Sequence, residues 1–195
     1  MSALLAVEDS IPHLARIADQ LRQVTVEIRS PGGSGVGAGI LWAPDLVVTN
    51  AHVARGSCVG VGLADERWIE AHLVVADRRM DLALFRIPRC GVAPAALGDS
   101  DTLRVGALVV ALGHPLGLRR TLTAGVVHAL GPARPGGRRF IHADVRLAPG
   151  NSGGPLADTA GQVVGMNTMI AGGLALAIPI NDVGRFVASA TASTT

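Results

Sequence analysis

The chain of 195 residues contains no lysine and no tyrosine, and aromatic side chains make up only 3% of it. Its 17 basic residues are therefore all arginines, and 15 acidic residues balance them to a formal net charge of +2. This balance is too even to predict a nucleic-acid partner from charge alone. We therefore expect no nucleic acid among the partners.

Cysteine is also scarce, with only Cys58 and Cys90 in the chain. Two cysteines do not build a disulfide framework, and a structural zinc site requires four ligands. The six histidines show no H-x-x-x-H or comparable spacing that would assemble a metal site. The sequence therefore predicts two reduced, inert thiols and no bound metal.

The first residues lack the basic region of a signal peptide, and Glu8 and Asp9 interrupt their apolar run. The uncharged stretch at residues 159–181 contains Gly172-Gly173 and Pro179. These residues favour two buried strands joined by a turn over a membrane-spanning helix. We therefore expect a cytoplasmic location and no membrane span.

Apolar residues are abundant at 49%, together with 25 glycines and 11 prolines. This composition excludes an intrinsically disordered chain, and the many turn residues favour an all-β fold. Short apolar runs separated by turns are typical of barrels or a sandwich. The expected strands lie at residues 24–28, 40–42, 46–48, 58–63, 68–75 and 82–87, and in a second set at 107–112, 121–130, 140–145, 162–169 and 174–178.

Short helices are expected at both ends of the chain. The pattern of residues 10–22 is helical, with one apolar face that either covers the chain's own domain or contacts another subunit. This face is formed by Ile11, Leu14, Ala18 and Leu21. Asn181 is a favourable N-cap for a final helix that runs to about residue 190.

The strongest chemical signal is a glycine-rich segment around one serine, Pro149-Gly150-Asn151-Ser152-Gly153-Gly154-Pro155. Glycines permit a tight turn that exposes the hydroxyl and directs backbone N–H groups at one point, where they can bind an oxyanion. Strand-like sequence precedes and follows this segment, which argues against a flexible loop.

A serine hydroxyl is a weak nucleophile unless a base accepts its proton, and the base needs a carboxylate to fix its tautomer. His52 directly follows the expected strand at 46–48. Asp81 begins the apolar strand at 82–87, where an unpaired carboxylate would be costly. Either residue alone is a weak signal, but the order His, Asp, Ser is specific and indicates nucleophilic catalysis.

With these motifs the chain resembles a trypsin-like serine protease of the HtrA (Deg) type over residues 23–183. The resemblance rests on a series of short matches in the same order. They are Thr49–Val53, Asp81–Leu84, Leu97–Asp101, Leu103–Gly106, Gly113–Gly117, Thr123–Val127, Asp144, Gly150–Pro155, Gly165–Thr168 and Ala177–Ile180.

The resemblance implies two six-stranded antiparallel barrels, with short N-terminal and C-terminal helices and an active site between the barrels. It divides the chain into an N-terminal helical segment (1–22), a first barrel (23–100) and a second barrel with the C-terminal helix (101–195). Many such proteases carry a C-terminal PDZ domain, which we do not expect here. They are often trimers held through N-terminal segments, so a homo-oligomer is one expectation.

By the same resemblance, Ser152 is the nucleophile, His52 the general base and then acid, and Asp81 the orienting carboxylate. The backbone N–H groups of Gly150 and Ser152 form the oxyanion hole. The implied reaction is endopeptidase hydrolysis of a polypeptide through an acyl-enzyme, without cofactor. The alternatives are a protease-fold binding or scaffold protein with weak or conditional catalysis and, less favoured, an esterase.

The resemblance also indicates which residues bind substrate. The expected specificity pocket is lined by Arg146, Leu147, Ala148, Met166, Asn167, Thr168 and Ala177. Most of these side chains are apolar, so we expect cleavage after small aliphatic residues. Arg146 would select acidic residues if it pointed inward. We favour an outward orientation, with Asp144 two positions away as its partner.

Arginines also gather at Arg119-Arg120 and in the segment that contains Arg134, Arg138 and Arg139. They form either a solvated loop surface or a patch that binds an anionic substrate or regulator.

Overall fold

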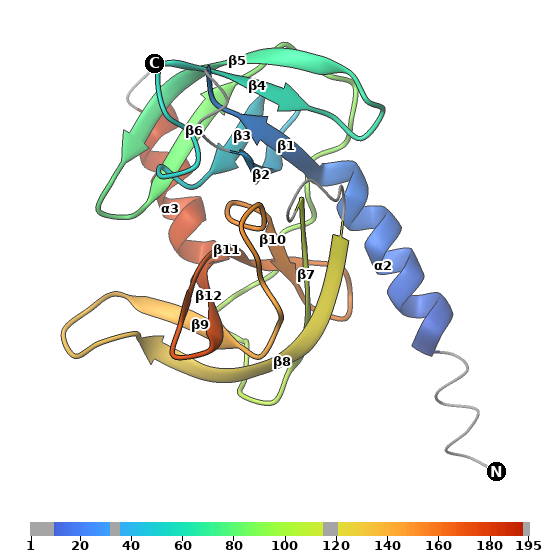
Figure 1. Cartoon of the computed structure of the whole chain (residues 1–195), viewed down its shortest axis with the longest axis vertical. Helices are drawn as coiled ribbons and strands as arrows, with labels where there is room; N and C mark the ends of the chain where they lie inside the picture. Colours follow the sequence, from blue (N-terminus) through green and yellow to red (C-terminus); the bar gives the residue numbers. More distant parts are fainter. Residues whose placement is uncertain (1–9, 32–35, 115–120, 193–195) are drawn as a thin grey trace.

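Twelve strands and two helices organise the described part of the protein, which is represented by a computed structural model that describes residues 10–31, 36–114 and 121–192. The strands close into two antiparallel barrels, in the orders β1-β2-β3-β6-β5-β4 and β10-β11-β12-β9-β8-β7. Figure 1 shows the first barrel above the second. The expectation of two six-stranded antiparallel barrels is therefore confirmed.

The first barrel contains strands β1 (Thr25–Arg29), β2 (Val36–Ala43), β3 (Leu46–Thr49), β4 (Cys58–Gly62), β5 (Trp68–Asp77) and β6 (Leu82–Arg86). The second contains β7 (Leu108–Gly113), β8 (Thr121–Pro132), β9 (Arg139–Ala143), β10 (Pro155–Ala157), β11 (Val163–Ala171) and β12 (Leu174–Pro179).

Apolar side chains from the two barrels fill the interior. Val47, Leu84 and Phe85 are fully buried in the first barrel, and Ile141 and Leu156 are buried in the second. At about 25 cal/mol per Å² of apolar surface removed from water, this burial is the main stabilising contribution to the fold. The interiors of both barrels are therefore filled by side chains, and the candidate active site lies on the loops that connect the strands.

Helix α2 (Ser10–Val24) packs against β1 and β7, and so touches both barrels. Ile17 and Leu21 are each only 1% exposed, while Leu14 is 37% exposed. His13 donates from Nε2 to the carbonyl oxygen of Thr159 in the second barrel at 2.6 Å. The C-terminal half of the apolar face therefore covers the chain's own barrels, and the oligomer stays a prediction.

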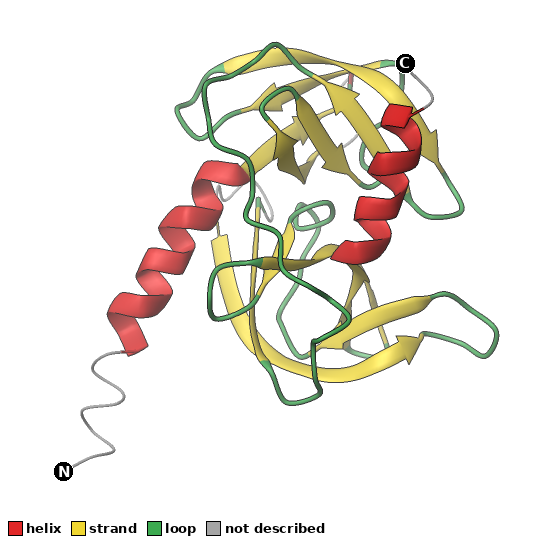
Figure 2. Ribbon diagram, turned by 180° about the vertical axis from the view of Figure 1, so that it is seen from behind, coloured by secondary structure: helices red, strands yellow, loops and turns green. Residues whose placement is uncertain are grey.

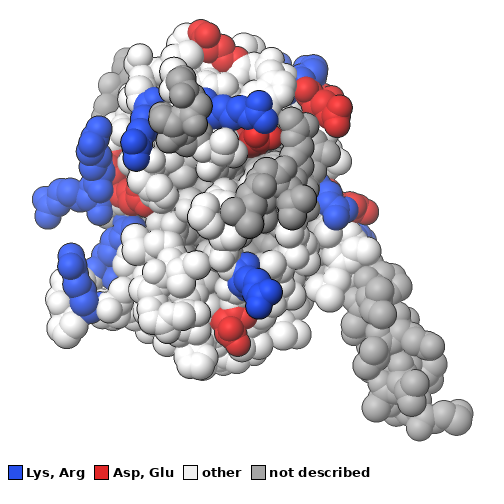
Figure 3. Space-filling view, viewed as in Figure 1, with Lys and Arg blue, Asp and Glu red and all other residues white. Residues whose placement is uncertain are grey.

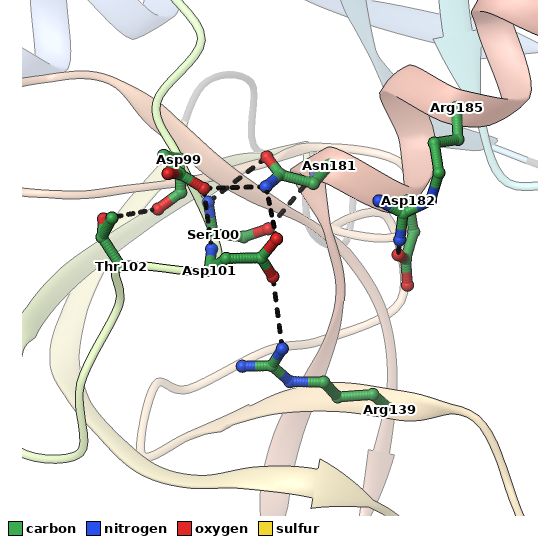
Figure 4. A network of polar contacts seen from close by, with 8 residues as sticks. All are labelled: Asp99, Ser100, Asp101, Thr102, Arg139, Asn181, Asp182 and Arg185. Carbon is green, nitrogen blue, oxygen red and sulfur yellow. Dashed lines mark hydrogen bonds and ion pairs between the residues drawn. The ribbon is translucent and has the colours of Figure 1, made fainter.

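Helix α3 (Ile180–Ala192) runs along the back of the molecule, where it follows β12 and reaches the first barrel (Figure 2). It begins one residue before Asn181, the expected N-cap. The Asn181 amide instead donates to Asp99 Oδ1 at 2.7 Å and to Asp101 Oδ2 at 3.0 Å. Figure 4 shows these bonds and the Arg139–Asp101 ion pair, which fasten the connection between the barrels to α3 and β9.

Among the described residues, no helix combines the length and the apolar character that crossing a membrane requires.

Candidate active site

His52 and Asp81 lie together because β3 and β6 are antiparallel neighbours in the first barrel. Thr49, the last residue of β3, pairs with Ala83 near the start of β6. The turn after β3 therefore lies beside the residue that precedes β6. The sheet register itself brings together two side chains that are 29 positions apart in the sequence.

The two side chains are directly hydrogen-bonded. His52 Nδ1 lies 3.0 Å from Oδ1 and 2.9 Å from Oδ2 of Asp81, and the backbone N–H of His52 also donates to Oδ1 at 3.0 Å. The hydroxyl of Thr168, from β11 of the second barrel, donates to Oδ2 at 2.8 Å. The Asp81 carboxylate thus accepts from both barrels.

Burial raises the pKa of Asp81, but the hydrogen bonds from His52 and Thr168 outweigh it, so that this pKa lies below its usual range. An ionised carboxylate only accepts hydrogen bonds, so Nδ1 of His52 carries the proton. Nε2 is then left as the proton acceptor, which is the state that a general base requires.

The backbone at Asp81 is held in an unusual conformation, with φ at 54° in the left-handed region. Such a conformation costs about 1–3 kcal/mol and persists only where the surroundings impose it. Here the side-chain amide of Asn50 donates to the carbonyl oxygen of Asp81 at 2.9 Å. Asn50 therefore helps to hold Asp81 in place.

Ser152 lies on the loop before β10, and the first barrel fixes that loop. The backbone N–H of Ala38 in β2 donates to the Ser152 carbonyl oxygen at 2.8 Å. The Ser152 hydroxyl donates to the carbonyl oxygen of Thr168 at 2.8 Å. Within the described residues it makes no hydrogen bond with His52. Thr168 thus connects Ser152 to the His52–Asp81 pair, because its carbonyl oxygen accepts from Ser152 and its hydroxyl donates to Asp81.

Glycine is required at two places in this loop. Gly153 has φ of 85°, and a Cβ there would lie 2.1 Å from the Ala38 carbonyl oxygen. A Cβ on Gly154 would lie 2.2 Å from the Leu112 carbonyl oxygen. Only glycine permits such close approach of backbone segments. The loop is therefore clamped between the two barrels.

The backbone N–H groups of Gly150 and Ser152, the expected oxyanion hole, donate to no other group in the described ranges. Gly150 has φ of 107°, a conformation that favours glycine. Neither donor is therefore committed to another group of the described residues.

A small pocket of about 270 Å³ opens beside Ser152. Its lining carries no charged side chain and consists of Leu147, Ala148, Pro149, Asn151, Ser152, Thr168, Met169 and Ile170. Three of the expected specificity residues line it: Leu147, Ala148 and Thr168. Met169 and Ile170, which sequence reasoning missed, extend β11 as exposed apolar residues.

The other expected pocket residues lie elsewhere. Met166, Asn167 and Ala177 are buried and do not line this pocket, and the Asn167 amide donates to the Pro155 carbonyl oxygen at 2.9 Å. Arg146 is exposed and lines a separate cavity of about 220 Å³. Asp144 lines the same cavity, but within the described residues the two side chains form no ion pair.

A larger cleft of about 920 Å³ opens on the His52 side of the site. It is lined by His52, Arg78, Arg79, Asp81, Ala133, Arg134, Gly137, Arg138, Phe140, Thr168, Met169, Ala171 and Leu176. Four of these residues are arginines and one is acidic. The cleft and the small pocket share Thr168 and Met169, so β11 separates them.

The geometry agrees with comparisons to known proteins. The family described as "Trypsin-like peptidase domain" matches residues 37–166, and the chain belongs to this family. Within it, the chain is 37% identical over 194 residues to a periplasmic DegP-like serine endoprotease of Pseudomonas fulva, covering 88% of this chain and 40% of that protein. It is 36% identical over 196 residues to the chloroplastic protease Do-like 1 of Arabidopsis thaliana, and the match covers 91% of this chain and 44% of that protein.

The solved structure of the HtrA-type protease AlgW with a tripeptide superimposes with a TM-score of 0.84 at 32% identity, covering 90% of this chain and 62% of that one. The HtrA/Deg resemblance is thereby confirmed. The chain spans about 40% of the length of the DegP-like relative.

The expectation of a cytoplasmic location is wrong. The similar DegP-like proteins are named as periplasmic, and the plant relative is named as chloroplastic. The expectation rested on the first residues of the sequence, and such a pattern is a weaker guide to location than the relatives.

Proposed function

We propose that this chain is a serine endopeptidase that hydrolyses polypeptides through an acyl-enzyme. The observation that carries the proposal is the hydrogen-bonded cluster in which Thr168 links Asp81, paired with His52, to Ser152. A hydroxyl, an imidazole oriented by a carboxylate, and free N–H groups are the components of acyl transfer. The names of the relatives support the same activity.

In the reaction, the Ser152 hydroxyl leaves the Thr168 carbonyl and donates to Nε2 of His52. As His52 takes the proton, Ser152 Oγ attacks the substrate carbonyl, and the N–H groups of Gly150 and Ser152 stabilise the oxyanion. The His52 cation, held by Asp81, then protonates the leaving amine. The C–N bond breaks and the acyl group stays on Ser152 Oγ. Water then attacks the acyl carbonyl carbon as His52 takes its proton, and His52 returns that proton to Ser152 Oγ as the carboxylic acid leaves.

The polypeptide binds as an added strand along β11. β10 pairs with β11 only over Val163–Met166, so beyond Thr168 the edge of β11 on that side has no strand partner among the described residues. An extended peptide can add to such an edge through main-chain hydrogen bonds. Met169 and Ile170 are 46% and 54% exposed there and provide apolar contact.

The residue before the cleaved bond enters the pocket beside Ser152. This pocket is apolar and small, so Val, Ala, Leu and Ile fit it, whereas a charged side chain would be desolvated without a partner. We therefore propose cleavage after small aliphatic residues. The exposed position of Arg146, outside this pocket, supports that preference.

The test is cleavage-site mapping by mass spectrometry on denatured proteins. Wild-type chain is expected to cleave after Val, Ala, Leu or Ile, and Ser152→Ala is expected to cleave at none of these sites. Sites that persist in Ser152→Ala, or that follow Asp, Glu, Lys or Arg, would contradict the proposal.

One observation favours a second candidate, conditional catalysis. The Ser152 hydroxyl donates to the Thr168 carbonyl instead of to His52, and in this geometry it cannot transfer its proton. Labelling of Ser152 by a fluorophosphonate separates the two candidates. Slow labelling that a bound peptide accelerates supports the conditional form, whereas equal rates with and without peptide support a constitutively competent site.

A further inference from the structure

The cleft on the His52 side is a concentration of positive charge next to the reaction centre. Arg78 and Arg79 come from the β5–β6 turn, and Arg134 and Arg138 come from the β8–β9 turn. Figure 1 shows both turns projecting on the same side of the molecule, and Figure 3 shows blue surface there. The two barrels therefore contribute a pair of arginines each to one cavity.

Within the part of the chain that the structure describes, three of these arginines have no carboxylate partner. Arg78, Arg79 and Arg134 are exposed, and no ion pair joins them to any acidic side chain of the described residues. Structural ion pairs do occur elsewhere in the chain, as between Arg86 and Asp45 at 2.9 Å. Water is therefore the remaining partner of these three guanidinium groups, and they are open to a ligand.

Arg138 is half-buried and held by two contacts. It donates to the Met80 carbonyl oxygen, and its guanidinium lies 4.5 Å from the centre of the Phe140 ring. Burial lowers the pKa of Arg138, and the charges of Asp81, Asp182 and Asp77 counteract that effect. The guanidinium thus stays a cation whose hydration is partly lost, which strengthens its attraction for an anion.

The nearby carboxylates are already engaged. Asp77 Oδ1 accepts from the backbone N–H groups of Arg79 and Met80 at 2.8 and 2.9 Å. Asp81 accepts from His52 and Thr168, and Asp182 is paired with Arg185. None of the three neutralises the arginines at the mouth of the cleft by direct contact.

The pleat of an added strand determines which side chains of a substrate reach the cleft. Successive side chains of a strand point to opposite faces. If the residue before the cleaved bond enters the small pocket, the second and fourth residues before that bond point to the opposite face of β11. Ile170 lines only the small pocket and Ala171 lines only the cleft, which fits this alternation, whereas Thr168 and Met169 lie at the border and line both.

The geometry points to a specificity site for acidic side chains, in which Arg134 and Arg138, assisted by Arg78 and Arg79, bind Asp or Glu at the second and fourth positions before the cleaved bond. This inference rests on the proposed function and names its substrate class: segments with acidic residues upstream of a small aliphatic residue. Guanidinium groups suit this task because their planar fork matches a carboxylate.

The test compares two internally quenched peptides that both carry Val before the cleaved bond, with Glu or with Gln at the second and fourth positions. The two Glu side chains should each form a solvent-accessible ion pair with the arginines of the cleft. We therefore expect wild-type kcat/KM to be about five- to tenfold higher for the Glu peptide at low ionic strength. Raising the salt concentration to 1 M should reduce this ratio, because the Debye length falls to about 3 Å. The Arg134→Gln/Arg138→Gln double variant should bring the ratio below about twofold.

Arg139→Gln is the matched control, because Arg139 adjoins Arg138 but pairs with Asp101 outside the cleft. It should keep the wild-type ratio. The Ser152→Ala variant provides a measurement independent of turnover, in which the Glu peptide should bind more tightly than the Gln peptide.

Equal affinities for Ser152→Ala together with equal kcat/KM for wild type would overturn this inference and leave the proposed function intact. Absence of cleavage of both peptides by wild type would overturn the proposed function. If the Glu peptide only accelerated cleavage of the Gln peptide, without being preferred itself, the cleft would bind a regulator instead, which would also overturn the inference.

Discussion

Thr168 is the residue whose loss should show most clearly how the site is held together. A Thr168→Val substitution keeps the shape of the side chain but removes the hydroxyl that donates to Asp81 Oδ2 at 2.8 Å. Thr168 is only 2% exposed, so water has little access to replace the lost donor. A hydrogen bond to a charged group contributes about 1.5–3 kcal/mol.

In the proposed mechanism Asp81 holds His52 during the proton transfer, so most of this energy should appear in the transition state. We therefore expect Thr168→Val to lower kcat/KM by about 10- to 100-fold, with little change in KM. The backbone carbonyl of Thr168, which accepts from Ser152, is retained in this variant. Peptide-substrate kinetics measure the effect, and Thr168→Ser, which keeps the hydroxyl, should recover most of the activity.

The same variant has a signature in pH. The folded-state pKa of Asp81 lies below its unfolded value, so its stabilising effect is present above the unfolded value and is lost as pH falls through the folded-state pKa. Loss of the Thr168 donor raises the folded-state pKa. The acid limb of thermal stability should therefore move to higher pH in Thr168→Val. Wild-type kcat/KM in Thr168→Val, together with an unmoved acid limb of thermal stability, would show that the Thr168 hydroxyl does not support Asp81.

Three further predictions concern the loop, the helix and activation. Gly153→Ala should lower the melting temperature and activity strongly, because its Cβ would lie 2.1 Å from the Ala38 carbonyl oxygen, whereas Gly131→Ala, with no atom within 4 Å, should have little effect on either. Leu21→Ala should reduce the free energy of unfolding by about 2–5 kcal/mol in chemical denaturation, and Leu14→Ala, at the exposed end of α2, should cost far less. In digestive trypsin-like enzymes an Asp directly before the nucleophile pairs with the N-terminus that a proteolytic cut creates. Asn151 stands at that position here and carries no charge, so the chain should be active with its first residues intact. Activity that appears only after a proteolytic cut would contradict this.

Much of the fold follows from local sequence patterns. Alternating or continuous apolar runs predicted eleven of the twelve strands to within a few residues. The missed strand, β10, has only three residues, Pro155–Ala157, and begins with proline. It is a strand because β7 and β11 flank it on both sides. Such long-range pairing leaves no local pattern.

In the candidate site, too, the sequence indicated the residue types but not the contacts between distant segments. His52, Asp81 and Ser152 were identified from residue type and order, and their triad roles remain predictions. The bond between Thr168 and Asp81 joins residues 87 positions apart, so spacing gave no sign of it. Similarly, the sequence left open whether Arg134 and Arg138 lie on a solvated loop, because only the fold places them across a cleft from Arg78 and Arg79.

The proposed function depends above all on Ser152 as the nucleophile of a peptide-bond hydrolase. The most direct measurement is peptide-bond cleavage by purified wild-type and Ser152→Ala chains on the same denatured protein, with folding of both checked by circular dichroism. Turnover by the variant should fall by about 10⁶-fold, to background. Turnover by Ser152→Ala within tenfold of wild type would show that Ser152 is not the nucleophile.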